Sequence, residues 1–359
     1  MLNLFGIVII FILPSTFAAV SCKNQQNQDV DWFVSYKVPR INDNSLQGVG
    51  DGVAFYYMDL TTDSFIPSSN DLNSTQQAIA YTLQQYYDNE KSLTSTFVLY
   101  NDEPSEDAPV YFRHLFDQIK LSTRYEKGHT KGIVYFEKSG GFWLIFSMPK
   151  FPSIEEYAYP SNAEKFGQSI LCMTFNYDEL TKIGTQLYYN HPLIYASNLV
   201  TSMASENPDL TNVIGGQYKK GSPFSSTLTL RTRGGQDFIS FAKTAEFGHD
   251  LYDTLVAPTL QTSLYVESWI YGHRIPCNGT LKYTVFDAVT MKVQTTTKFN
   301  STHDHSKLAI STDSSMPFIC IGDVNRMSSL YIRGGGTVCI KSKKLWDAYS
   351  PMFIVVNRC

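Results

Sequence analysis

Two short units with the spacing His-x-Lys constrain the fold of this chain more than any other feature of its sequence. His129 and Lys131 stand in GHTKG at 128–132, and His305 and Lys307 stand in DHSK at 304–307. The two histidines are 176 residues apart, which is close to half of the 338 residues that follow position 21. This spacing predicts two similar halves that each contribute one unit to a single site.

Each unit opens a strand-turn-strand pattern. The strand-like runs GIVYFE (132–137) and FWLIFSM (142–148) predict a hairpin with its turn at Gly140-Gly141. HSKLAIS is followed by the turn-like TDSSMP and by FICIG at 318–322. Because residues i and i+2 of a strand point to the same face, we expect the imidazole and the ammonium of each unit to lie side by side.

The rest of the chain predicts an α/β fold with mixed β-sheets flanked by helices. Alternating apolar residues predict further strands at 96–100, 169–175, 264–269 and 337–340. Apolar residues at helical spacing predict helices at 75–88, 178–189 and 237–255. No low-complexity linker divides the chain, so we expect a first half at 22–175 and a second half at 176–359.

The N-terminal segment is typical of a cleaved secretory signal peptide at residues 1–21. It carries no charged side chain, is apolar from Leu4 to Leu13 and ends in the small-x-small sequence Ala19-Val20-Ser21. A membrane anchor is the alternative, but the apolar run is shorter than the ~20 residues that cross a bilayer. No later segment predicts a membrane span, so we expect a product of the secretory pathway.

Cysteines and sequons agree with an oxidising compartment. An even number of cysteines after position 21 predicts three disulfides, although their spacing leaves the pairing open. No CxxC unit is present, which disfavours a structural zinc site. The three N-x-S/T sequons predict glycosylation at Asn73, Asn278 and Asn300.

The net charge disfavours a protein that coats nucleic acid through a strongly basic surface. The chain has 29 basic and 33 acidic residues, a formal charge of −4 at pH 7. Protonation of all seven histidines would change this to +3, so we expect a polyanion to bind better near pH 5 than at pH 7.

The paired units suit phosphodiester hydrolysis without a metal or another cofactor. The lysines can stabilise the non-bridging oxygens, one neutral imidazole can attack phosphorus, and the other, protonated, can donate to the leaving alkoxide. A single His-x-Lys is more often a solvated strand face, so it is the repetition that favours catalysis. The sequence signatures of serine hydrolases, zinc proteases and P-loop NTPases are absent.

Other candidate residues have a simpler alternative. His303 is either a metal ligand or a residue without a role in the site. The segment RGGGT at 333–337 either approaches a phosphate through its backbone or forms a tight turn. Four basic residues contact a nucleic-acid backbone or are merely solvated: Lys219, Lys220, Arg231 and Arg233. In each case the second reading is favoured.

A series of ordered motifs resembles the deoxyribonuclease II family of acid endonucleases, and its nematode members most of all. The motifs span the chain after the signal peptide and include VDWFVSYK (30–37), LYNDEP (99–104), GHTKG, SMPKFP (147–152), FGQSILC (166–172), FAK (241–243), DHSK, CIGDVNR (320–326) and RGGGTVC (333–339). The resemblance implies a phospholipase D-like fold in which two halves share one active site. It also implies metal-independent hydrolysis of DNA to 3′-phosphate and 5′-hydroxyl ends in lysosomes or outside the cell.

The resemblance also implies roles for individual residues. The catalytic residues would be His129, Lys131, His305 and Lys307, and the phosphate would be oriented by Asn325 and Ser147. The implied disulfides are Cys22–Cys172, Cys277–Cys359 and Cys320–Cys339. Leu308 and Lys150 depart from residues found in some relatives. A catalytically inactive paralogue that binds nucleic acid or another partner on this scaffold is the alternative, which the two intact pairs disfavour; a phospholipase is disfavoured by the extent of the resemblance.

Overall fold

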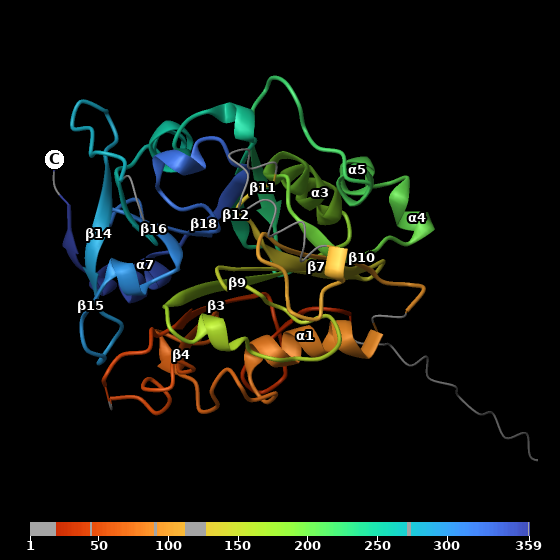
Figure 1. Ribbon diagram of the computed structural model, residues 1–359, viewed down its shortest axis with the longest axis horizontal. Helices are drawn as coiled ribbons and strands as arrows, with labels where there is room; N and C mark the ends of the chain where they lie inside the picture. Colours follow the sequence, from red (N-terminus) through yellow and green to blue (C-terminus); the bar gives the residue numbers. More distant parts are fainter. Residues whose placement is uncertain (1–18, 44, 90–91, 112–126, 271–273, 358) are drawn as a thin grey trace, which may run out of the picture.

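The computed structural model describes residues 19–359 apart from 44, 90–91, 112–126, 271–273 and 358, so the predicted signal peptide lies outside the described residues except for positions 19–21. Two β-sheets lie face to face, with helices between and outside them (Figure 1). The strands are β1 (Cys22–Lys23), β2 (Asp29–Val30), β3 (Trp32–Lys37), β4 (Phe55–Asp59), β5 (Ile66–Pro67), β6 (Thr96–Asn101), β7 (Lys131–Glu137), β8 (Gly140–Phe146), β9 (Gln168–Phe175), β10 (Ile194–Asn198), β11 (Ser225–Arg231), β12 (Asp237–Lys243), β13 (Leu264–Ser268), β14 (Val285–Met291), β15 (Phe299–Asn300), β16 (Lys307–Ser311), β17 (Phe318–Gly322), β18 (Gly335–Lys341) and β19 (Phe353–Val356). The α-helices are α1 (Ala78–Asn89), α3 (Glu179–Asn190), α4 (Thr201–Ala204), α5 (Pro208–Ile214), α6 (Ala257–Leu260) and α7 (Lys343–Tyr349). The short 3₁₀ segments are η1 (Ser161–Ala163), η2 (Ala245–Phe247), η4 (Ser301–His303), η5 (Ser328–Leu330) and η6 (Ser350–Met352), and η3 (Tyr252–Val256) is a π-helical turn.

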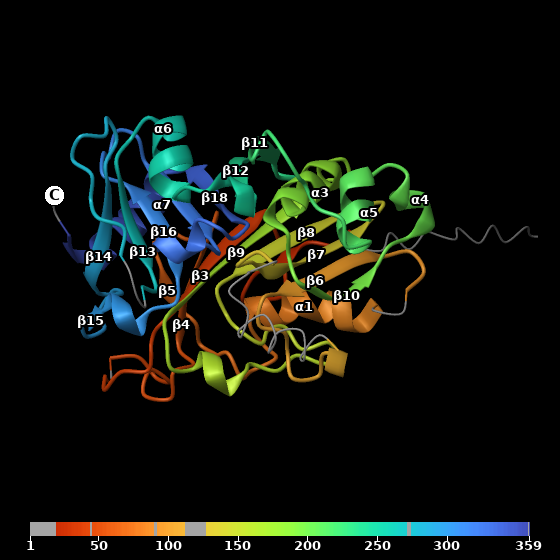
Figure 2. The ribbon, with the colours of Figure 1, turned by 45° about the horizontal axis from the view of Figure 1, so that its top comes forward.

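The two sheets repeat one arrangement of strands (Figure 2). The first has the order β10-β6-β7-β8-β9-β3-β4-β5 and the second the order β11-β12-β18-β17-β16-β13-β14-β15, so β6-β7-β8-β9-β3 corresponds to β13-β16-β17-β18-β12. The register repeats as well, because Lys131 pairs with Asn101 of β6 and Lys307 pairs with Ser268 of β13. The prediction of two similar α/β halves is confirmed at the level of the fold. The second sheet is mixed, because it contains the parallel pair β13–β14, whereas the strand pairs of the first sheet are antiparallel among the described residues. Strand β10 lies beyond residue 175 and yet in the first sheet, and the boundary between the halves at 175 stays a prediction.

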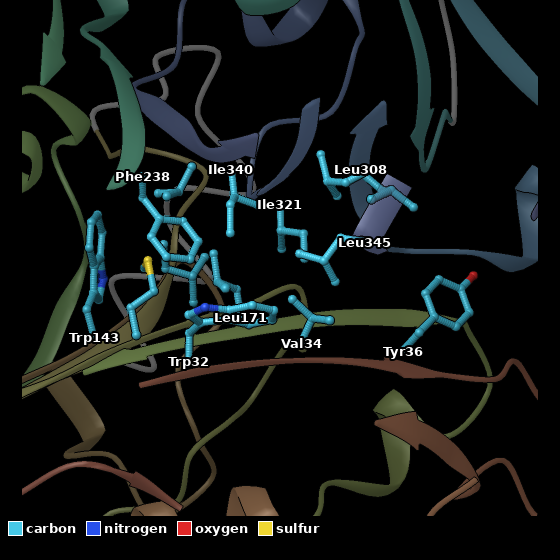
Figure 3. Close-up of a cluster of buried hydrophobic side chains, with 14 of the residues drawn as sticks. Trp32, Val34, Tyr36, Trp143, Leu171, Phe238, Leu308, Ile321, Ile340 and Leu345 are labelled. Atoms are coloured by element: carbon cyan, nitrogen blue, oxygen red, sulfur yellow. The ribbon is translucent and has the colours of Figure 1, made fainter. Parts of the chain in front are cut away.

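The largest core lies between the sheets. Side chains from the facing strands meet there, as Figure 3 shows for Trp32, Val34 and Leu171 of the first sheet opposite Ile321 and Ile340 of the second. Helices α3 and α7 contribute to this core, whereas α1 packs on the outer face of the first sheet and η3 with α6 on the outer face of the second. Both sheets are therefore covered on both faces, as apolar strands require. In the described part of the chain no helix is long and apolar enough to cross a bilayer.

Helix α3 shows how sequence spacing produces this layering. Its buried residues Leu180, Ile183 and Leu187 recur at intervals of three and four, so they form one apolar stripe facing the inter-sheet core. Helix α1 does the same with Ile79, Leu83 and Tyr86 on the outer side. The helices predicted at 75–88 and 178–189 are thus confirmed, as are the predicted strands.

Two local predictions are wrong. The helix predicted at 237–255 is strand β12 over its first seven residues, and the rest of the range contains the 3₁₀ turn η2 and the start of the π-helical turn η3. Strand β12 lies between β11 and β18 and has apolar side chains on both faces, with Phe238 in the inter-sheet core and Phe241 in the outer one. This removes the period-two alternation that identifies a strand. The first hairpin turns at residues 138–139 and not at Gly140-Gly141, because Glu137 pairs with Gly140.

The structure contains the three disulfides that the resemblance implied. They join Cys22 to Cys172, Cys277 to Cys359, and Cys320 to Cys339. The three sequon asparagines, Asn73, Asn278 and Asn300, are exposed, and glycosylation there stays a prediction.

Candidate active site

His129 lies in the loop that leads into β7. Strands β7 and β16 begin at the lysines, so both histidines precede their strands, contrary to the expectation that each unit stands within one. The backbone N–H of His129 donates to Gly334 O (2.9 Å) and its ring Nδ1 contacts Asp323 O at 2.5 Å. A neutral imidazole bonded to a carbonyl in this way carries its proton on Nδ1 and has its lone pair on Nε2. The two contacts come from the two ends of the loop that connects β17 to β18, so the second half holds the first half's histidine.

Asp102 organises the cations around His129. This carboxylate follows β6 directly and forms an ion pair with Lys131, receives a 3.0 Å hydrogen bond from Arg333 Nη2, and lies 3.9 Å from His129 Nε2. Burial by itself would raise the pKa of Asp102, but the positive charges of His129, Lys131 and Arg333 outweigh it and hold that pKa below its ordinary value. Asp102 is therefore an anion that fixes Lys131.

The loop before His129 can approach the rest of the protein closely because it contains a glycine. A Cβ at Gly128 would lie 2.0 Å from Asn190 O, at the end of α3. The N–H of Gly128 donates to His191 O (2.7 Å), and its carbonyl accepts from Arg333 Nη2 (2.8 Å). A side chain at this position would push the His129 loop away from both contacts.

His305 lies between two aromatic rings. It stacks on Phe166 with a centroid distance of 4.0 Å and an interplanar angle of 10°, and Trp269 lies 4.3 Å away on a tilted plane. Its backbone N–H donates to Gly167 O (2.8 Å), so the loop before β9 of the first half holds the second half's histidine. Its Nε2 is buried and has no hydrogen-bond partner within the part of the chain that the structure describes. This nitrogen is therefore a buried polar atom that the described part of the protein leaves without a partner.

Lys307 is the buried cation beside His305. Its ammonium donates to His305 O, and its backbone N–H donates to Ser169 Oγ (3.2 Å). Burial, and then the charge of Lys131, lower its pKa to about 7.

Glu267 of β13 is fully buried, and neither of its oxygens has a hydrogen-bond partner among the described residues. Its burial, with the charges of Asp304 and Asp287, raises its pKa well above the ordinary value.

The two His-Lys pairs belong to one electrostatic site. Burial, followed by the positive charges of Lys307, Lys131 and His129, lowers the pKa of His305 to about 2. Burial also lowers the pKa of His129 well below its ordinary value, and the charge of Lys307 acts in the same direction. The His305 ring is thus neutral in the DNA-free protein at pH 5, and burial disfavours the charged form of His129. The expectation that all seven histidines protonate near pH 5 is wrong for His305 and for His191, whose pKa burial and nearby lysines lower to about 3.

The remaining predicted residues lie near this centre in different ways. Asn325 is buried two residues after Asp323, and its Oδ1 has no hydrogen-bond partner among the described residues. Ser147 donates to Gln168 Oε1 (2.6 Å) and accepts from Ser169 N (3.0 Å), so it supports the residue that contacts Lys307. Lys150 faces outward and forms an ion pair with Glu106. Within the residues that the structure describes, no group of three or more His, Cys, Asp and Glu side chains is placed to hold a metal ion.

Sequence reasoning missed several residues of the site. Asp102 and Asp323 stood in the quoted motifs LYNDEP and CIGDVNR, but nothing in their local sequence indicated that they would meet His129. Phe166 and Trp269 are ordinary core residues by pattern. The only signal in the sequence was that each of these residues lies just before, at the end of or just after a predicted strand of the sheets that carry the His-x-Lys units.

A duplicated α/β fold of two sheet-rich halves around one site is the architecture of phospholipase D-like proteins. The family model for deoxyribonuclease II matches residues 21–359. Deoxyribonuclease-2 of Caenorhabditis elegans is 48% identical over 370 residues, which cover 98% of both chains. Plancitoxin-1 of Acanthaster planci is 35% identical, covering 95% of this chain and 93% of its own, and Deoxyribonuclease-2-alpha of Mus musculus is 35% identical, covering 93% and 92%. The chain belongs to the deoxyribonuclease II family and is an enzyme of that family.

Proposed function

We propose that the protein is an acid endonuclease that hydrolyses DNA to 3′-phosphate and 5′-hydroxyl ends, without a metal, by means of His129, Lys131, His305 and Lys307. The observation that carries this proposal is the crosswise construction of the site, in which each histidine is bonded to a loop of the other half. The three disulfides fit a secretory route, and we propose that the enzyme acts in lysosomes or outside the cell, on DNA from dying cells.

The chemistry follows from the charges in the site. A phosphodiester anion enters between the ammonium groups of Lys131 and Lys307, which stabilise the charge on its non-bridging oxygens. Nε2 of one neutral histidine attacks phosphorus, an N–P bond forms, and the bond from phosphorus to the 5′ oxygen breaks. The second histidine, protonated in the DNA complex, gives its proton to that oxygen. Water then attacks phosphorus and gives a proton to the second histidine, the N–P bond breaks, and the 3′ side leaves as a phosphate monoester.

We assign the attack to His129 and the proton donation to His305. The contact of His129 Nδ1 with Asp323 O fixes the tautomer that has its lone pair on Nε2, and the backbone bond to Gly334 holds the ring in place. His305 has an unpartnered Nε2 between two aromatic rings. It can take a proton when the phosphate anion arrives. Asn325, whose Oδ1 lacks a partner among the described residues, is proposed to orient the phosphate or a lysine.

The pH dependence of kcat/KM follows from the two lowered pKa values. His305, with a pKa of about 2 in the free enzyme, must gain a proton for the reaction, so log kcat/KM is expected to fall by about one for each pH unit from 4 to 7. Above pH 7 the fall becomes steeper, because Lys307, with a pKa of about 7, loses its charge. Initial rates with short DNA over pH 4–9 measure this, and Lys307→Arg, which stays charged, should remove the steeper part. A rate that rises with pH would contradict the assignment.

A basic cavity beside His129 favours a long polymer as substrate. The cavity has a volume of about 700 Å³ and includes Lys127, Lys219, Lys220 and Tyr218 in its lining. Lys127 Nζ donates to Tyr218 Oη (2.7 Å), and the ring of His191 packs on that of Tyr218. Because His191 O accepts from Gly128 N, the wall of this cavity continues into the His129 loop. Clustered lysines and aromatic rings suit phosphates and bases on one side of the scissile bond.

The double variant Lys219→Ala/Lys220→Ala is expected to affect long DNA alone. Loss of two phosphate contacts should lower kcat/KM on plasmid DNA about tenfold at physiological salt. It should also make the slope of log kcat/KM against log salt concentration shallower by roughly two. Hydrolysis of a phosphodiester the size of a dinucleotide should be unchanged. The matched control is Lys343→Ala/Lys344→Ala on α7, which is expected to match the wild type on both substrates. Equal losses on the two substrates would contradict a role in binding the polymer.

A further inference from the structure

Two buried lysines occupy equivalent places in the two halves. Lys37 is the last residue of β3 and Lys243 the last residue of β12, the two strands that correspond in the repeated sheet order. Lys37 pairs with Gln168 at the start of β9, and Lys243 pairs with Gly335 at the start of β18. Both lysines are 0% exposed. Burying an ammonium is costly, so a lysine kept at both positions calls for a physical reason.

Each ammonium is bonded to three backbone carbonyls of one loop. Lys37 Nζ donates to Ala163 O (3.1 Å), to Glu164 O and to Phe166 O (2.7 Å). In the same way Lys243 Nζ donates to the carbonyls of Leu330 (2.9 Å), Tyr331 (3.1 Å) and Arg333 (2.5 Å). Three acceptors match the three N–H groups of a charged ammonium, whereas a neutral amine would leave one carbonyl without a donor. Each lysine therefore fixes the course of the loop that wraps around it.

The loop held by Lys37 contacts His305. Phe166, whose carbonyl Lys37 binds, stacks its ring on the imidazole of His305. The next residue, Gly167, accepts from His305 N (2.8 Å) and donates to His303 O (2.9 Å). A Cβ at Gly167 would lie 2.5 Å from Asp304 Oδ1, so this loop lies directly against the DHSK segment.

The loop held by Lys243 contacts His129. Arg333, whose carbonyl Lys243 binds, donates to Asp102 Oδ2 (3.0 Å) and to Gly128 O (2.8 Å). The next residue, Gly334, accepts from His129 N (2.9 Å). The two arrangements are thus equivalent, and both act from one half of the protein on the histidine of the other.

We propose that Lys37 and Lys243 are positioning residues that act crosswise, Lys37 on His305 through the 163–167 loop and Lys243 on His129 through the 330–334 loop. This inference rests on the proposed function for its effect on catalysis, although the crosswise effect on the histidines does not depend on activity. The motifs that end in these lysines, VSYK and FAK, thereby acquire a role beyond the core.

The test uses Lys37→Met and Lys243→Met, which keep the side-chain length and remove the N–H donors. Because a displacement of about 1 Å can cost about 10²-fold in rate, each variant is expected to lower kcat on plasmid DNA about 10²-fold with KM changed less than about twofold. Lys138→Met, at an exposed lysine of the first half, is the control and should behave as the wild type. Each kcat is calculated from the concentration of correctly folded protein, so that a loss of stability alone would leave kcat unchanged.

NMR of histidine-labelled protein without DNA supplies the distinguishing measurement. Lys37→Met is expected to shift the ring resonances of His305 and leave those of His129 in place, and Lys243→Met is expected to do the reverse. The inference is overturned if kcat stays within twofold of the wild type, or if either variant shifts both histidines equally. Where a methionine variant does not fold, Lys37→Arg and Lys243→Arg keep a cation with several donors and must show the same crosswise shifts. Inactivity of the wild type on DNA would defeat the proposed function and leave the NMR result to be judged separately.

Discussion

The His305→Ala variant is expected to lose about 10⁴-fold in the rate of plasmid cleavage and to regain much of that rate on a phosphodiester with a nitrophenolate leaving group. A positioned general acid contributes up to about 10⁴-fold when the leaving group is an alkoxide, and little when the leaving group departs without a proton. His129→Ala removes the attacking nitrogen and should be inactive on both substrates. The difference between the two substrates therefore separates the attacking histidine from the histidine that donates the proton.

The intermediate provides a second measurement of the same assignment. Rapid acid-free quenching of His305→Ala with the activated substrate, followed by peptide mass spectrometry, should find on His129 a phosphoryl group that is still esterified to the remaining part of the substrate. His303→Ala, which changes the exposed neighbour of the DHSK segment, is the control and should retain wild-type rates on both substrates. Phosphate on His305 in a His129→Ala protein that still turns over would reverse the assignment.

The Arg326→Met variant is expected to lower the free energy of unfolding by about 3–5 kcal/mol at pH 7, the cost of removing one partner from a buried ion network. The side chain of Arg326 is 1% exposed, and its guanidinium lies 3.0 Å from Asp287 Oδ1 and 3.4 Å from Asp250 Oδ2. Its backbone N–H donates to Ser268 Oγ (3.0 Å), which ties the Asn325 segment to β13. Loss of the cation leaves buried carboxylates without a counter-charge.

The sign of the pH effect follows from these carboxylates. Burial, with the charge of Asp253, raises the pKa of Asp250 to about 7, and burial raises that of Asp287. In the variant both pKa values rise further, so the folded protein binds more protons than the unfolded chain from about pH 4 upward, and its stability falls as pH increases. The deficit should be larger at pH 8 than at pH 5. Urea unfolding at the two pH values measures it, with Arg231→Met, at an exposed ion pair, as the control without a measurable change. A deficit that grows toward acid pH would contradict this account.

The fold could be predicted from the sequence where one residue pattern has one structural meaning. The hairpins after His129 and His305 follow from apolar runs bounded by turn residues, and α3 follows from the spacing of Leu180, Ile183 and Leu187. Strand β12 was predicted as a helix because both of its faces are covered, and burial on two faces erases the alternation on which strand prediction depends. Because of this error, nothing in the sequence indicated that Lys243 stands at the end of a strand beside the site.

The candidate site could be predicted only as far as its repeated motif. The two His-x-Lys units stood out because they occur twice at half-chain spacing. Asp102, Asp323 and Phe166 contact the two histidines across 27 to 194 residues of sequence, and local patterns carry no information about such pairs. Asp323, for example, meets His129 by a backbone carbonyl, which any residue could supply. The same holds for the carbonyls around Lys37, since the loop that provides them is more than 120 residues away. Tertiary contacts, not composition, define these roles.

The central claim is that His129 and His305, one from each half, form a single site that cleaves DNA without a metal. Its most direct test is cleavage of plasmid DNA at pH 5 in excess EDTA by the wild type, His129→Ala and His305→Ala, each purified with its disulfides formed. We predict that the wild type cleaves under chelation and leaves 3′-phosphate ends, and that neither variant cleaves measurably in the same time. Abolition of wild-type cleavage by EDTA, or retention of the wild-type rate by either variant, would contradict the claim.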